Sequence, residues 1–180
     1  VEALKKQGFT HVVFAIGAWK QSTLALQKGA AANVIEFLEQ AKQAPETLKL
    51  GKNVVILGAG NTAMDAARVA KRTKGVEHSF IVYRRTKQFM PADAEELELA
   101  LEDGVEFKEL LAPVSYENGI LRCEKMKLGE RDADGRQKPV PSGEFVNIPA
   151  DTVIASIGEK IDTDLFAESG IALDGNCLLY

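Results

Sequence analysis

The sequence predicts an α/β fold in which helices cover a parallel sheet, and three observations support this prediction. Short apolar runs alternate with helical patterns between residues 53 and 107, as in the strands and crossover helices of a parallel sheet. A glycine-rich turn joins the first of these strands to its helix. Two hairpin dipeptides, Asn118-Gly119 and Asp134-Gly135, indicate an antiparallel β-meander over 112–149, inserted before a last buried strand at 151–157.

Two further segments precede the glycine turn. Residues 10–17 form a short apolar run that ends in glycine, which predicts a buried strand. Residues 30–41 carry apolar side chains at helical spacing. The stretch at 43–52 contains proline, glycine and polar residues, and it therefore indicates a linker or boundary.

Two helices are expected between the turn and the meander. The helix nearer the meander starts with Asp93 as its N-cap, has Glu96 three residues later and stops near Gly104. The acidic residues between 95 and 103 most simply form its solvated face. The helix that follows the glycine turn presents a narrow stripe of small residues, which allows close packing on a sheet. These residues are Ala63, Ala66, Ala67 and Ala70.

The composition is that of a folded domain without polyanion-binding character. Of the 180 residues, 46% are hydrophobic and 27% are charged, which suits a globular chain with a core. The net charge of −4 argues against general binding to nucleic acid or anionic membranes. No apolar run approaches the length of a membrane span. The sequence thus predicts neither a nucleic-acid partner nor a membrane-spanning segment.

Cysteine usage and the two chain ends also carry expectations. Cys123 and Cys177 are far apart and form no C-x-x-C, so we expect no metal or iron–sulfur ligation by this chain. Two lone thiols indicate a reducing compartment, and we expect a cytoplasmic protein. The chain starts at Val1 and stops at Tyr180 in an apolar run, which suggests a piece of a longer protein.

The turn itself has the pattern of a dinucleotide-binding site. Its G-x-G-x-x-G/A sequence follows an apolar strand and opens a helix, which is the context that this motif requires. The first glycine permits the tight turn, the second lets a pyrophosphate approach the backbone, and the small third position packs helix on strand. The helix amides then face the phosphates. The motif residues are Gly58, Gly60, Asn61, Thr62 and Ala63.

The end of the next strand favours NADP over NAD. NAD-binding units usually place an acid there to bond the ribose hydroxyls. This chain has Arg84 and Arg85 instead, and a guanidinium can hold a 2′-phosphate through two hydrogen bonds. The alternative interpretation is a pair of solvated loop arginines.

Three stretches together resemble a known family: GAGNTAMDAAR, VYRRTKQFMPADAEELELALEDGVEF and ADTVIASIGE. They are similar to the pyridine-nucleotide domain of glutamate-synthase-small-subunit-like iron–sulfur flavoproteins, and most similar to the selenate reductase subunit of bacteria. The flavin region of dihydropyrimidine dehydrogenase is a more distant relative. The resemblance covers nearly the whole chain.

This resemblance implies a three-layer Rossmann-like fold of the FAD/NAD(P)-binding, two-dinucleotide flavoprotein type. It implies that residues 1–50 are the end segment of an FAD domain and a linker, that 51–160 are the NADPH-binding domain, and that 161–180 begin the return to the FAD domain. In the parent protein, NADPH would pass a hydride to FAD and electrons would continue to iron–sulfur centres. The partners of this region would then be the FAD domain and iron–sulfur region of the same parent chain.

Site residues carried over from the family are the five turn residues for the pyrophosphate, Arg84 and Arg85 for the 2′-phosphate, and Gly158. Gly158 stands where the family has I-G-Q followed by a proline, whereas Glu159, Lys160 and Ile161 depart from that pattern. No catalytic side chain is expected, because in hydride transfer the cofactors carry the chemistry. This chain alone should bind NADPH without turnover.

Two other functions remain open from the sequence. The first is a non-enzymatic dinucleotide sensor whose ligand moves a partner domain. The second is a stand-alone NAD-dependent dehydrogenase, against which the lack of a Tyr-Lys or His-Asp arrangement counts.

Overall fold

The computed structural model describes residues 1–15, 17–18, 20–22, 24–131, 137–168, 170–171, 173–174 and 177–178. Its contacts divide the chain into two compact units. The smaller unit combines Val1–Ser22 with Gly158–Tyr180, and the larger unit is Thr23–Ile157. No helix among the described residues is long and apolar enough to cross a membrane.

The smaller unit contains short elements. Its β1 (Lys20–Gln21) pairs antiparallel with β10 (Glu159–Lys160), and β11 (Leu173–Asp174) pairs antiparallel with β12 (Cys177–Leu178). Its helices are α1 (Glu2–Lys6) and α5 (Thr163–Glu168). The prediction of a strand at 10–17 is wrong for the residues that the structure describes there, because no described strand pairs with them.

The larger unit is built on a five-stranded sheet in which every neighbouring pair is parallel. The strand order is β2-β9-β3-β4-β5. Parallel strands buried on both faces are expected to be continuous apolar runs, and β3 and β4 have this character. The strands are β2 (Ala32–Asn33), β3 (Asn53–Leu57), β4 (His78–Val82), β5 (Glu106–Lys108) and β9 (Thr152–Ala155).

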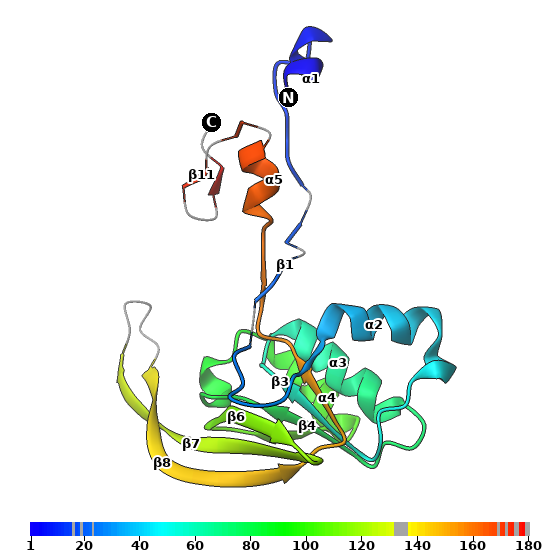
Figure 1. The fold of residues 1–180 in the computed structure, drawn as a ribbon, viewed down its shortest axis with the longest axis vertical. Helices are drawn as coiled ribbons and strands as arrows, with labels where there is room; N and C mark the ends of the chain where they lie inside the picture. Colours follow the sequence, from blue (N-terminus) through cyan, green and yellow to red (C-terminus); the bar gives the residue numbers. More distant parts are fainter. Residues whose placement is uncertain are drawn as a thin grey trace. The chain divides into compact units, whose positions relative to one another are not determined.

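Side chains alternate between the two faces of this sheet and create two cores. Val54 and Ile56 of β3 pack in the core under the helices, whereas Val55 and Leu57 pack in a core on the other face. The first face is covered by α2 (Val34–Gln43), α3 (Asn61–Arg72) and α4 (Ala94–Glu102), as Figure 1 shows. Two single-turn 3₁₀ helices lie in loops, η1 (Pro45–Thr47) and η2 (Lys87–Phe89).

The second face is covered by a three-stranded antiparallel meander, so the unit has three layers as predicted. Its strands are β6 (Leu111–Glu117), β7 (Ile120–Arg131) and β8 (Gln137–Pro149). Leu121, Cys123 and Ile148 are buried against the sheet. The Asn118-Gly119 hairpin is confirmed, since both residues have positive φ between β6 and β7. Asp134-Gly135, the second predicted turn, lies outside the described residues.

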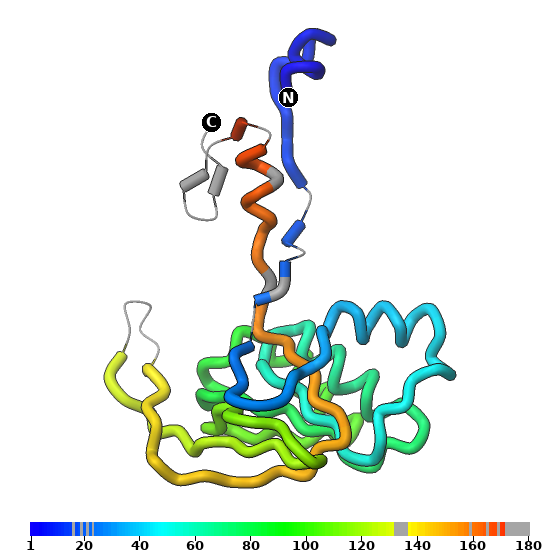
Figure 2. Tube along the Cα trace, viewed as in Figure 1, coloured from blue at the N-terminus to red at the C-terminus, as the bar shows by residue number. Residues whose placement is uncertain are grey.

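The path of the chain gives the sheet its topology. From β3 the chain runs through α3 to β4 and through α4 to β5, moving outward in one direction. After the meander it returns to the opposite side of β3 as β9, a path that Figure 2 follows along the Cα trace. The division between units falls at Ser22 and Gly158, so β2 and α2 share a unit with the glycine turn. The assignment of flanking segments to an FAD domain stays a prediction.

Candidate functional site

The glycine turn lies at the carboxyl end of β3, in the middle of the sheet. β4 continues the chain on one side of β3, whereas β9 lies on the other side. In open α/β sheets a ligand binds beyond the carboxyl ends of the strands, at the point where the chain order reverses. The turn between β3 and α3 occupies that point in this sheet.

Gly58 is required by the protein's own packing. Its φ of +125° belongs to the region that favours glycine. A Cβ at this position would overlap the carbonyl oxygen of Ser156, the residue that follows β9. The Gly58 amide donates to the carbonyl of Val82 at 3.1 Å, and the Ser156 amide donates to Leu57 at 2.8 Å. The turn is therefore fixed to the neighbouring strands on both sides.

Gly60 is different, because the fold does not demand a glycine there. It is the N-cap of α3 with φ −89°, an ordinary value for any residue. Among the described residues, a Cβ on Gly60 would have only Pro91 Cγ within 4 Å, at 3.9 Å. No side-chain hydrogen bond caps this helix. The first N–H groups of α3 thus border an open backbone surface, where an anion can be bound.

Ala63 and the three following alanines form the contact between α3 and the sheet. All four side chains, those of Ala63, Ala66, Ala67 and Ala70, are completely buried. The buried Ser79 hydroxyl in β4 donates to the carbonyl of Ala67 at 2.9 Å, which shows how closely helix and strand approach. The predicted stripe is confirmed, and a small residue at position 63 is a packing requirement.

Residues 83–93, here called the arginine loop, lead from β4 back to the glycine turn. The Tyr83 hydroxyl donates to the carbonyl of Phe89 at 2.8 Å and closes the loop on itself. At its far end the Ala92 amide donates to the carbonyl of Ala59 at 3.1 Å. The structure therefore brings together the turn and the loop that sequence analysis identified separately.

The two arginines of this loop have different surroundings. Arg84 is exposed and makes no hydrogen bond or ion pair within the described part of the chain. Arg85 is half-buried, and its Nε donates to the carbonyl of Gln137, at the start of β8, at 3.1 Å. Arg85 therefore connects the loop to the meander, whereas the Arg84 guanidinium is available to an anion.

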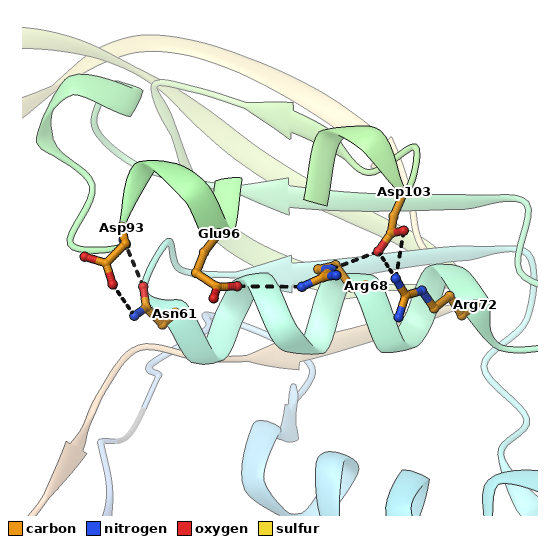
Figure 3. A network of polar contacts seen from close by, with 6 residues as sticks. All are labelled: Asn61, Arg68, Arg72, Asp93, Glu96 and Asp103. Carbon is orange, nitrogen blue, oxygen red and sulfur yellow. Dashed lines mark hydrogen bonds and ion pairs between the residues drawn. The ribbon is translucent and has the colours of Figure 1, made fainter. Parts of the chain in front are cut away.

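Asn61 and Asp93 are joined by two reciprocal hydrogen bonds, shown in Figure 3. The Asn61 amide nitrogen donates to Asp93 Oδ2 at 2.9 Å, and the Asp93 backbone N–H donates to Asn61 Oδ1 at 2.9 Å. Asp93 is at the N-cap position of α4, as predicted, but its side chain makes no capping bond. This pair is not evident from the sequence, in which the Asp93 carboxylate is expected to cap its own helix.

A second link between α3 and α4 involves residues expected to face solvent. Arg68 Nε donates to Asp103 Oδ2 at 2.8 Å, and Arg72 lies within 2.7 Å of the same carboxylate. Glu96 lies 3.7 Å from Arg68. The hydrogen bonds from Arg68 and then Arg72 lower the pKa of Asp103. The prediction of a solvated acidic face is therefore wrong for Glu96 and Asp103, and the i, i+4 spacing of the two arginines was the available signal.

Gly158 belongs to the smaller unit. Its φ is +97°, and its carbonyl accepts a hydrogen bond from the Ser22 amide at 3.1 Å. Its part in cofactor binding stays a prediction.

The described residues contain no cluster of His, Cys, Asp or Glu that could hold a metal ion. Cys123 is completely buried in the core between sheet and meander. Burial raises the pKa of its thiol to about 12, so the reactive thiolate is scarce at neutral pH. Cys123 is therefore a core residue.

Comparison with known proteins places these features in a family. YgfK of Escherichia coli strain K12, which carries the name of an oxidoreductase, is 47% identical over 98% of this chain. The glutamate synthase [NADPH] small chain of the same strain is 38% identical over 69% of this chain. The matched regions are 17% of the former and 28% of the latter, so the chain spans a small part of either relative.

Solved structures show the same fold. FprA of Mycobacterium tuberculosis, determined in complex with NADPH, aligns with a TM-score of 0.66 and 18% identity, covering 81% of this chain and 49% of FprA. The family model described as pyridine nucleotide-disulphide oxidoreductase matches residues 2–178. This match includes the glycine turn, the arginine loop and the meander. The chain therefore belongs to the pyridine nucleotide-disulphide oxidoreductase family.

Proposed function

We propose that the larger unit binds NADPH, with the pyrophosphate on the glycine turn and the 2′-phosphate at the arginine loop. The observation that carries this proposal is the exposed Arg84, which has no protein partner in the described chain and follows β4 where an NAD site would have an acid. The pyrophosphate would lie against the backbone of Gly60 and the N–H groups of Asn61 and Thr62 at the start of α3, whereas the Ala63 N–H donates to the Gly60 carbonyl at 2.9 Å.

The contributions of the other turn residues follow from their packing. Gly58 sets the turn, because a side chain there would overlap Ser156. Ala63 lets α3 approach the sheet, which aims the helix N-terminus at the ligand. Arg85 borders the 2′-phosphate position, and its Nε keeps the start of β8 beside the loop. The chain thus supplies binding and orientation, while NADPH supplies the hydride.

In the parent protein, NADPH would supply a hydride to FAD, and electrons would pass on to iron–sulfur centres. Two similar proteins support the choice of nucleotide: the glutamate synthase [NADPH] small chain has NADPH in its name, and FprA was solved in complex with NADPH. We propose a cytoplasmic flavoprotein of the glutamate-synthase-like kind. The sequence resemblance suggests a selenate reductase or glutamate-synthase-like subunit as the parent protein.

Paired titrations of NADPH and NADH against the chain test the nucleotide assignment. NADPH should bind at least about tenfold more tightly, since a hydrogen bond between charged groups contributes about 1.5–3 kcal/mol. Arg84→Ala should remove most of this preference, and Arg85→Ala should remove less. Equal binding of the two nucleotides would contradict the 2′-phosphate assignment. So would an unchanged preference for NADPH in the variant that combines Arg84→Ala and Arg85→Ala.

The redox proposal is tested on the parent protein. Its absorption spectrum should show flavin bands that bleach on addition of NADPH, and acid-labile sulfide should be present. A sensor would bind NADPH without carrying flavin. A stand-alone dehydrogenase would instead turn over NADH with this chain alone.

A further inference from the structure

The Asn61–Asp93 pair connects two segments that would hold opposite ends of one ligand. Asn61 belongs to the glycine-turn motif and is the first residue of α3. Asp93 ends the arginine loop and precedes α4. The two reciprocal bonds between them, both 2.9 Å long, are visible at the left of Figure 3.

Asp93 makes these bonds in place of its usual local one. An N-cap aspartate ordinarily accepts a hydrogen bond from an N–H in the first turn of its own helix. No such bond is present at α4, and the carboxylate accepts from Asn61 on the neighbouring helix instead. The side chain therefore serves the connection between segments and not the capping of α4.

The other contacts at this place join the same two segments. The Ala92 amide bonds to the Ala59 carbonyl, and Pro91 Cγ is the nearest atom to where Gly60 would carry a Cβ. These contacts place the end of the loop along the turn. The Asn61–Asp93 bonds add the only side-chain hydrogen bonds between turn and loop among the described residues.

We infer that the Asn61–Asp93 pair is a clamp that sets the spacing between the pyrophosphate turn and the arginine loop, and so determines how strongly NADPH is preferred over NADH. This inference rests on the proposed function. Asn61 and Asp93 act as positioning residues, because they work through the placement of Arg84. A rigid spacing matters, since a guanidinium binds a phosphate well only in a narrow geometry.

If the Asn61–Asp93 pair only stabilised the fold, its loss would act as any destabilising change does. A second pair between the same two helices provides a control for this alternative. Arg68, in the interior of α3, and Asp103, the C-cap of α4, also join the two helices. Loss of that pair weakens the same helix contact without touching the turn. Arg68→Met is therefore a matched variant for destabilisation alone.

The experiment measures dissociation constants for NADPH and NADH on the whole 180-residue chain, together with Tm. The variants are Asn61→Ala, the exchange Asn61→Asp with Asp93→Asn, and Arg68→Met. Both nucleotides carry the same pyrophosphate, so an effect on the turn itself cancels in the ratio of their affinities. The ratio isolates the 2′-phosphate contact.

Asn61→Ala should lower the NADPH-to-NADH affinity ratio by about fivefold, the size expected for a charged hydrogen bond that is partly lost. In the exchanged pair the backbone N–H of position 93 can still donate to the side chain of position 61, and the side-chain bond can form again with its donor at position 93. The ratio should therefore return to within about twofold of the wild type. Arg68→Met should lower Tm and leave the ratio unchanged.

An unchanged ratio in Asn61→Ala, with a wild type that prefers NADPH, overturns the clamp and leaves the proposed function standing. So does an Arg68→Met variant that lowers the ratio equally. A wild type with no preference for NADPH overturns the nucleotide assignment, and the clamp with it.

Discussion

The carbonyl oxygen of Ser156 occupies the space that a side chain on Gly58 would need. This relationship joins the glycine turn to the strand across the switch point of the sheet. It also shows that the two glycines of this motif are present for different physical reasons. Gly58 is needed by the fold, whereas no contact within the described part of the chain requires a glycine at position 60.

Gly58→Ala should destabilise the chain by at least about 2 kcal/mol, because it combines a positive φ with an overlap against backbone. Urea unfolding followed by circular dichroism measures this loss. Gly75→Ala is a suitable control, since Gly75 also has a positive φ but has open space around its Cβ position. Equal losses in both variants would show that the Ser156 contact adds nothing.

Gly60→Ala should behave in the opposite way. The free energy of unfolding should change by less than about 1 kcal/mol, because a Cβ meets no close atom and the backbone is ordinary. NADPH affinity should fall by about tenfold or more, since the methyl group would occupy the path of the pyrophosphate. Calorimetric titration measures the NADPH affinity of both proteins. Wild-type affinity in this variant would mean that the pyrophosphate binds elsewhere.

Asp103 should make stability depend on pH. Hydrogen bonds from Arg68 and Arg72 hold its folded-state pKa below the ordinary value of 3.8. Its stabilising effect is therefore complete above about pH 4 and is lost as the pH falls through the lower folded-state value. Asp103→Asn should lower Tm at pH 7, and the difference in Tm from the wild type should shrink as the pH falls below 3.8. Glu102→Gln, at an exposed neighbouring position, should show no such pH-dependent difference in Tm from the wild type.

The Cys123 thiol should resist modification in the native protein. It is completely buried, and burial raises its pKa to about 12. In a Cys177→Ser background, a thiol reagent at pH 8 should label Cys123 only at the rate of unfolding, and urea should accelerate labelling. Rapid native labelling would mean that the core between sheet and meander opens readily.

Local pattern was sufficient to predict most of the larger unit. The strand, turn and alanine stripe from residue 53 to residue 70 are contiguous, and each depends on neighbours within a few positions. The Asn118-Gly119 hairpin was predictable for the same reason, because the turn conformation selects its own residues. The three layers follow once these elements are placed, since both faces of a parallel sheet must be covered.

The contacts that sequence analysis missed all join distant segments. Asn61 and Asp93 are 32 residues apart, and their side chains have local alternatives that sequence pattern favours. The same holds for Arg85, whose Nε bonds to a carbonyl 52 residues away. The apolar run at 10–17 failed as a strand for a related reason. A strand exists only when another strand pairs with it, and a sequence pattern does not supply that partner.

The placement of β9 beside β3 has a consequence for synthesis of the chain. Val54 pairs with Thr152, almost a hundred residues later, so the middle of the sheet is completed only when β9 leaves the ribosome. Until then, one edge of β3 has unpaired backbone groups that other nascent chains can bind. Pairing across such a separation is also intrinsically slow. β9, the last strand of the five-stranded sheet along the chain, therefore affects both the folding time of the domain and the interval during which it is prone to aggregate.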